Sequence, residues 1–186
     1  MQKHLIVDGV IAAQLPNAGD VFSNFIKDFD TIIEIGYHRG GFSRWIHQNK
    51  SKKSKLVCYD ISDRDRIVTD NGIDFRLGDC FSEIIIKEIN DLIQKSKKTL
   101  VLCDGGSKNQ EFNLYAHLIK SGDVIMLHDY HDDTLSETYE SYTGPLWQSS
   151  AESNFSSIKD TVRTLNLEKY NYDSLRSVIW GAFIKP

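Results

Sequence analysis

The chain has 186 residues, a length that predicts a single domain with a substantial hydrophobic core. With 40% hydrophobic and 26% charged residues it has the composition of an ordinary globular protein, and its net charge of -4 argues against general attraction to nucleic acid or anionic membranes. Three scattered cysteines, no apolar stretch of membrane-spanning length and no signal-peptide pattern together predict a reduced protein of the cytoplasm.

The first part of the chain predicts a helical lead-in, residues 1–30, followed by a strand. Apolar residues recur at helical spacing over residues 19–29, and TIIEI at 31–35 is a short apolar run. Glycines follow this run, and a second helix is expected over residues 42–49. Lysines are frequent in the next connection, residues 50–55, but no aromatic residues lie among them, so we interpret it as a solvated turn and not a nucleic-acid patch.

The middle of the chain alternates apolar runs with amphipathic segments. The further strands are expected at residues 55–60, 73–77, 99–103 and 123–129. The helices between them are expected at residues 62–69, 82–96 and 110–122. Each connection is long enough for a crossover helix, so the strands should be parallel neighbours in one sheet.

The last third of the chain is less regular. Residues 130–154 lose periodicity, and we interpret them as a lid or substrate loop. A helix is expected over residues 155–165, and residues 167–185 predict a hairpin that turns near Asp173-Ser174. The predicted fold is a single Rossmann-like α/β domain, residues 1–186, a three-layer sandwich. Its seven-stranded sheet is mostly parallel with a C-terminal antiparallel hairpin.

An acidic residue ends each of the five expected parallel strands. These residues are Glu34, Asp60, Asp79, Asp104 and Asp129. Because parallel strands place their carboxyl ends at one edge, and because ligands of open α/β sheets bind there, this row predicts a site for hydroxyls, amines or a metal ion.

The segment Glu34–Gly41, EIGYHRGG, is the first chemical signature. Glycines after a strand let the backbone approach a ligand closely, and the following helix start offers free N–H groups. A dinucleotide site would need a second glycine where this chain has His38, which weakens the case for NAD. An acid on the strand would repel phosphates but suits a cationic amino-acid group, while Asp60 could accept both hydroxyls of a ribose.

The order EIGYHRGG, VCYD, LGDC and LCDGG resembles the class I S-adenosylmethionine-dependent methyltransferases over about the first 130 residues. More narrowly, the stretch from DGG at 104–106 to HDY at 128–130 resembles the small-molecule O-methyltransferases of the family 24 and cephalosporin hydroxylase-like group. The resemblance implies S-adenosylmethionine as cofactor and methylation of a hydroxyl group on a small molecule. We further expect no nucleic-acid or membrane partner, and the sequence leaves open whether the chain forms a homo-oligomer.

The resemblance also implies site residues. The expected cofactor-binding residues are Glu34, Gly36, Tyr37, His38, Gly40, Asp60, Ile61, Asp79, Cys80 and Asp104. Asp104, His128 and Asp129 match metal ligands of the metal-dependent members, although a histidine at 128 is less suited to Mg²⁺ than the acid usual there. Without Mg²⁺ or another divalent cation, the candidate catalytic residues are His128, His131 and Lys108.

Each of these assignments has a simpler alternative. Asp104 and Asp129 could cap loops and helices, His128 could be an ordinary hydrogen-bonded histidine, and Lys108 and His131 could be solvated. At the level of the whole chain the alternatives are an inactive cofactor-binding or regulatory module and, with lower weight, an NAD(P)-dependent oxidoreductase.

Overall fold

The computed structural model describes residues 4–63, 72–132 and 153–186. Most of the helix expected at 62–69 and most of the loop expected at 130–154 therefore lie outside the described residues. Within these ranges no helix is both long enough and apolar enough to cross a membrane.

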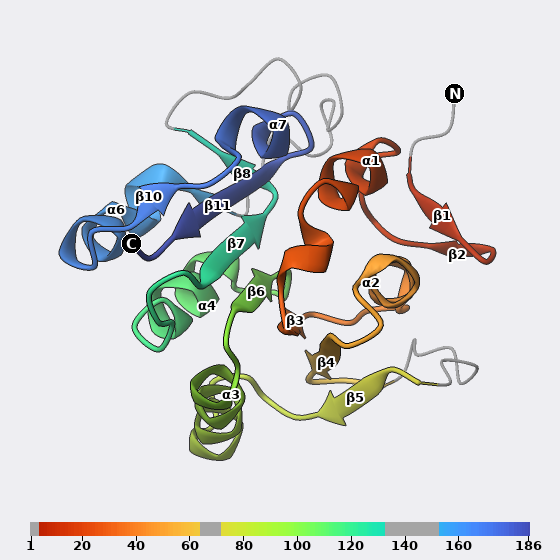
Figure 1. Ribbon diagram of the computed structural model, residues 1–186, viewed down its shortest axis with the longest axis horizontal. Helices are drawn as coiled ribbons and strands as arrows, with labels where there is room; N and C mark the ends of the chain where they lie inside the picture. Colours follow the sequence, from red (N-terminus) through yellow and green to blue (C-terminus); the bar gives the residue numbers. More distant parts are fainter. Residues whose placement is uncertain (1–3, 64–71, 133–152) are drawn as a thin grey trace.

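A seven-stranded sheet forms the centre of the fold (Figure 1). In spatial order its strands are β10 (Glu168–Lys169), β11 (Trp180–Ile184), β7 (Val124–His128), β6 (Thr99–Cys103), β3 (Thr31–Ile35), β4 (Lys55–Asp60) and β5 (Asp74–Leu77). The five strands from β7 to β5 pair in parallel, while β11 pairs antiparallel with both β7 and β10. This is the mostly parallel Rossmann-like α/β fold that the sequence predicts.

Helices cover both faces of the sheet, which explains why the central strands are apolar throughout. On one face lie α1 (Ala18–Ser23), α2 (Gly41–Asn49) and α7 (Tyr172–Arg176), and on the other α3 (Glu83–Lys95), α4 (Lys108–Tyr115) and α6 (Phe155–Thr164) (Figure 1). All five residues are buried in β3, β6 and β7 alike. The result is the expected three-layer sandwich, with one hydrophobic core on each face of the sheet.

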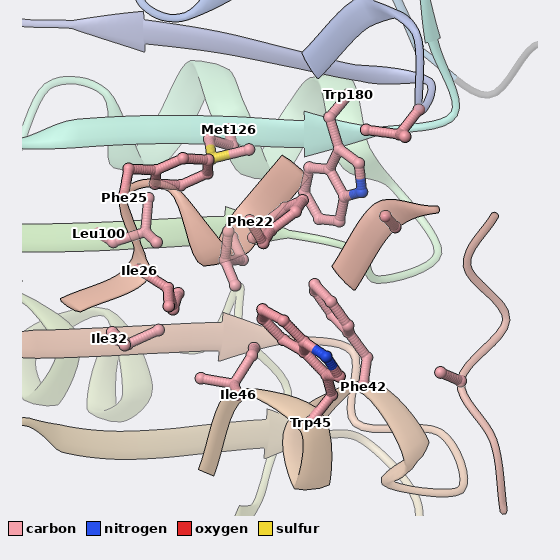
Figure 2. Close-up of a cluster of buried hydrophobic side chains, with 14 of the residues drawn as sticks. Phe22, Phe25, Ile26, Ile32, Phe42, Trp45, Ile46, Leu100, Met126 and Trp180 are labelled. Atoms are coloured by element: carbon pink, nitrogen blue, oxygen red, sulfur yellow. The ribbon is translucent and has the colours of Figure 1, made fainter. Parts of the chain in front are cut away.

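An aromatic cluster fills the core beneath α1 and α2 (Figure 2). Phe22 is fully buried and its ring packs edge-on against Phe42 and Trp180 at centroid distances of 5.1 and 5.4 Å. Trp45 stacks on Phe42 at 6.1 Å. Because such rings interlock and bury large apolar areas, this cluster fixes Trp180 at the carboxyl end of β7.

The N-terminal segment differs from the expected helical lead-in. It begins with a hairpin of β1 (Ile6–Val7) and β2 (Val10–Ile11), joined by Asp8 and Gly9 at φ values of 49° and 79°. Asp-Gly with two positive φ angles matches a type I′ turn, the turn that suits two-residue hairpins. The helix expected over 19–29 is also shorter, because α1 ends at Ser23 and a 3-10 turn, η1 (Ile26–Asp28), follows.

Three other boundaries depart from expectation. The helix expected at 110–122 is α4, which starts at Lys108 and ends at Tyr115. The expected turn near Asp173-Ser174 is the short helix α7, so β10 and β11 do not form a simple hairpin. The two ends of the expected 130–154 loop pair as short parallel strands, β8 (Tyr130–His131) and β9 (Ser153–Asn154).

Candidate functional site

A cavity of about 770 Å³ lies at the carboxyl ends of the parallel strands, within the usual size of small-molecule sites. Most residues expected at the site line it. These are Glu34, Gly36, Tyr37, His38, Asp60, Ile61, Asp79, Cys80, Asp104, Lys108, His128 and Asp129. Gly40 and His131 are not among the lining residues, so the structure does not bring them to the cavity.

The loop after β3 packs tightly against the loop after β6. Gly36 has a φ of +96°, and a Cβ atom there would lie 2.2 Å from the carbonyl oxygen of Asp104. Only glycine allows this approach. Gly40, at φ +77°, precedes α2, and a Cβ there would meet the ring of Tyr37. Gly40 thus shapes the turn into α2, and its expected contact with the cofactor stays a prediction.

Asp60 joins two loops at the rim of the cavity. Its carboxylate accepts the backbone N–H of His38 at 2.9 Å and that of Ser62 at 3.0 Å. Carboxylate oxygens can accept further hydrogen bonds, so these two contacts leave room for ligand hydroxyls. The structure therefore places a fixed carboxylate at the end of β4, the position the sequence predicts for ribose recognition.

The rim beyond Asp60 is apolar. Ile61 is 72% exposed and Phe81 is 38% exposed, and both line the cavity. Asp79 accepts the backbone N–H of Phe81 at 2.9 Å, so this carboxylate holds the loop that carries the ring. Sequence reasoning missed Phe81. Two exposed apolar side chains on one rim form a surface suited to a flat, partly apolar ring.

Glu34 lies in the cavity wall, but its carboxyl group is buried in the protein interior. It is 1% exposed and accepts hydrogen bonds from the hydroxyl of Ser43 and, at 3.2 Å, from the thiol of Cys58. Burial raises the pKa of Glu34 to about 8, although both hydrogen bonds act in the opposite direction. Burial thus favours the uncharged form of this side chain at neutral pH, and its contact with a cationic amino-acid group stays a prediction.

Glu111 in α4 is a second buried carboxyl group, and the sequence analysis did not single it out. It accepts the backbone N–H groups of Gly105 at 3.2 Å and Ser107 at 3.1 Å. Burial raises the pKa of Glu111 to about 7, against the lowering effect of these hydrogen bonds. Glu111 therefore fixes the loop after β6. A glutamate in the first turn of a helix after a glycine pair was the available signal.

Four charged or polar side chains meet at the inner end of the cavity. Nδ1 of His128 lies 2.9 Å from Oδ1 of Asp104 and 3.6 Å from Oδ2 of Asp129. Nζ of Lys108 lies 3.2 Å from Oδ2 of Asp129. Their side chains are only 5–15% exposed. This cluster joins two of the five strand-end acids, Asp104 and Asp129, to two of the three candidate catalytic residues, His128 and Lys108.

The electrostatics of the cluster favour charge on the imidazole. Burial acts to lower the pKa of His128, but the charges of Asp104 and Asp129 and the hydrogen bond to Asp104 outweigh it. The pKa of His128 is consequently raised above the ordinary histidine value. A proton accepted by this ring would be stabilised by the two carboxylates.

The same cluster can be tested as a metal site. Asp104, His128 and Asp129 offer ligand atoms within 4.8 Å of one another. However, Asp104 and His128 already bond each other, and Lys108 already places a positive charge against Asp129. A divalent cation would have to displace both interactions, so this arrangement does not fit a resident metal.

The third catalytic candidate has different surroundings. Nδ1 of His131 bonds the carbonyl oxygen of Asp132, and the residue lies on β8 outside the cavity lining. The structure therefore gives no geometric support to His131 as a base.

Comparisons with known proteins agree on one broad class. The sequence model of the FtsJ-like methyltransferase family matches residues 12–141, more than half of the chain. The ribosomal RNA large subunit methyltransferase E of Wigglesworthia glossinidia brevipalpis is 32% identical over 82 residues, 44% of this chain and 38% of that protein. The chain therefore spans about two fifths of the length of this curated relative.

Solved structures match over most of the chain. A structure of CmcI with magnesium and S-adenosylmethionine covers 96% of this chain and 75% of its own, with a TM-score of 0.64 and 14% identity. The O-methyltransferase TomG of Streptomyces achromogenes, in complex with S-adenosylmethionine, covers 94% and 82%, with a TM-score of 0.51 and 11% identity. At these identities the matches show the fold alone. The narrower resemblance to the family 24 group stays a prediction.

Proposed function

Because the chain belongs to the FtsJ-like methyltransferase family, we propose that it uses S-adenosylmethionine to methylate a hydroxyl oxygen of a small molecule. The observation that carries this proposal is the pair of His128 and Asp104 in the wall of a cavity that also has a carboxylate and an apolar rim. The matches are to methyltransferases, so the NAD(P) alternative gains no support from them.

The residues of the cavity fit the proposed cofactor. The close approach that Gly36 permits leaves backbone groups next to the ligand space, where a methionine carboxylate and amine need partners. Asp60 would accept ribose hydroxyls, and Ile61 and Phe81 would flank the adenine. When bound, S-adenosylmethionine supplies a methyl carbon attached to a positively charged sulfur.

The residues at the inner end of the cavity supply what this reaction needs from a protein. An acceptor oxygen must be aligned with the methyl carbon and must lose its proton. His128 would take that proton, and Asp104 would hold the ring and stabilise its charge. Lys108, paired with Asp129, would place a fixed positive charge near the oxygen as negative charge develops on it.

The charge of the chain and of its cavity favours a small acceptor. The chain has a net charge of -4, and Asp60, Asp79, Asp104 and Asp129 all line the cavity, an arrangement that would repel a phosphate backbone. RNA is the second candidate acceptor. It is favoured by the similarity to a ribosomal RNA methyltransferase over 82 residues.

Transfer of a radiolabelled methyl group from S-adenosylmethionine tests the proposal. The acceptors are a library of small hydroxylated molecules and, in parallel, total RNA. We expect label in one or more small molecules and none in RNA, with activity unchanged by a chelator. Label in RNA alone would favour the second candidate. Binding of S-adenosylhomocysteine without any transfer would indicate the inactive module.

Two variants show whether the transfer depends on the proposed base. His128→Gln keeps a hydrogen-bonding side chain beside Asp104 but removes the basic nitrogen, so activity should fall about 100- to 10,000-fold. His117→Gln is the matched control, because His117 is exposed on the surface of the protein. An unchanged rate in His128→Gln would exclude His128 as the base.

A further inference from the structure

Gln14 is a buried side chain that the reaction as described above does not use. It is 0% exposed, and it joins two residues that are distant in the sequence. Its Oε1 accepts the indole N–H of Trp180 at 2.8 Å, and its Nε2 donates to Oδ2 of Asp104 at 2.9 Å. An indole nitrogen only donates and a carboxylate only accepts, so these neighbours permit one orientation of the amide.

The hydrogen bonds of Gln14 continue from Asp104 to His128. With Oδ2 of Asp104 held by Gln14, Oδ1 faces Nδ1 of His128 at 2.9 Å. Because a carboxylate oxygen accepts hydrogen bonds, this contact places the hydrogen on Nδ1. In the neutral ring the lone pair is then on Nε2. This nitrogen is buried from solvent, and within the part of the chain that the structure describes it has no hydrogen-bond partner.

Trp180 contacts both ends of this series of hydrogen bonds, because it donates to Gln14 and also packs against His128. It lies on β11 directly beside His128 of β7, and the two side-chain rings are 4.8 Å apart between centroids with 34° between their planes. Trp180 is itself locked by Phe22 and Phe42 in the aromatic cluster (Figure 2). The hydrophobic core therefore fixes the donor that orients Gln14, and the same indole packs against the imidazole.

We propose that Gln14 is a positioning residue that holds Asp104 so that His128 keeps its hydrogen on Nδ1 and its lone pair on Nε2. This inference deepens the proposed function and rests on it for the catalytic consequence. Because Nε2 is buried, an acceptor hydroxyl must displace the atoms that cover it; its proton then passes to Nε2, and the electron pair of that O–H bond stays on oxygen. The oxygen forms a bond to the methyl carbon while the pair of the carbon–sulfur bond returns to sulfur.

The tautomer of His128 can be measured without knowing the acceptor. Nitrogen NMR of protein labelled with ¹⁵N-histidine distinguishes the two ring nitrogens, and His128→Gln assigns the signals by removing them. At alkaline pH, where the ring is neutral, the wild type should show hydrogen on Nδ1 only. Hydrogen on Nε2 in the wild type would overturn the proposal, and this reading needs no Gln14 variant.

Variants at Gln14 then test whether this side chain determines the tautomer of His128. Gln14→Met has a similar length but neither accepts nor donates in the same way, so His128 should become a mixture of tautomers. Gln14→Glu places a carboxylate against Asp104 and should disturb the ring further. Gln48→Met is the control, since Gln48 is exposed and its amide donates to Asp8, which is not part of the cluster. A wild-type tautomer in both Gln14 variants would contradict the positioning role.

Kinetics separate this inference from the proposed function. Once an acceptor is known, Gln14→Met should lower kcat about 10-fold or more while the affinity for S-adenosylhomocysteine changes less than about 3-fold. Equal losses in both quantities would indicate a merely structural role and would overturn the inference. If no acceptor is ever methylated but the tautomers behave as expected, the proposed function fails and the role of Gln14 in orienting the ring stands.

Discussion

At the scale of single residues, Asp60 gives the sharpest test of cofactor recognition. Asp60→Asn keeps the shape of the side chain but loses the charge that strengthens hydrogen bonds to hydroxyl groups. The affinity for S-adenosylhomocysteine, measured by calorimetry, should fall about 10- to 100-fold, because such bonds contribute about 1.5–3 kcal/mol. Asp63→Asn changes an exposed acid three residues away and should leave the affinity unchanged. Equal affinities in both variants would exclude Asp60 from the binding site.

Glu34 makes a prediction about stability and pH. Its pKa is raised from an ordinary value of 4.5 to about 8 by burial, so between these values the folded protein holds a proton that the unfolded chain has released. The contribution of Glu34 to stability is thus fully present below pH 4.5 and is lost as the pH rises through about 8. With one proton difference between the folded and unfolded states, the free energy of unfolding falls by at most about 1.4 kcal/mol per pH unit.

Urea denaturation between pH 5 and pH 8 measures this slope. Glu34→Gln has no proton to lose, so its free energy of unfolding should depend less steeply on pH than that of the wild type. Glu83→Gln, at an exposed position in the first turn of α3, should behave like the wild type. Parallel curves for wild type and Glu34→Gln would show that Glu34 is ionised in the folded protein.

At the scale of elements, the contact between the loops after β3 and β6 depends on Gly36. Alanine there would bring its Cβ within 2.2 Å of the carbonyl oxygen of Asp104. It would also have to adopt a φ of +96°, which is strained for any residue but glycine. Neither strain can be relieved without moving a loop. We expect Gly36→Ala to lower the free energy of unfolding by about 2–4 kcal/mol. Gly106→Ala, where a Cβ meets no atom within 4 Å, should change it by less than about 0.5 kcal/mol. Similar thermal melting of the two variants would refute the tight packing.

The elements also show how far sequence patterns reach. Strands such as TLVLC and VIMLH were predictable because both of their faces are buried, which forces a continuous apolar run. The position of the acids together at one edge of the sheet was predictable for the same topological reason. The N-terminal hairpin was missed although Asp8-Gly9 is a strong hairpin signal, because the apolar spacing further on dominated the interpretation.

Other features left no local signal in the sequence. Gln14 and Trp180 are 166 residues apart, and their hydrogen bond depends on β11 entering the sheet beside β7. Ser43 bonds Glu34 only because α2 returns over β3. Such contacts are set by the packing of distant segments. A motif search therefore finds the strand-end acids but not the residues that orient them.

At the scale of the whole molecule, charge is unevenly distributed between the two edges of the sheet. The strand-end acids line the cavity, whereas lysines gather in the connections that lead into β4 and β6, at the opposite edge. Several of these lysines have local partners. Nζ of Lys50 donates to the carbonyl of Ser54 at 2.7 Å, and Lys98 lies over the ring of Phe29. This agrees with their interpretation as solvated turns, and the absence of a nucleic-acid partner stays a prediction.

A crystal structure with S-adenosylhomocysteine would show whether the cavity at the carboxyl edge of the sheet binds the cofactor. We expect the nucleoside in the cavity at the carboxyl ends of β3 and β4, with its ribose hydroxyls on Asp60 and its adenine between Ile61 and Phe81. The sulfur should face the side where His128 and Asp104 meet. An empty cavity at saturating ligand, or a nucleoside bound elsewhere, would contradict this expectation.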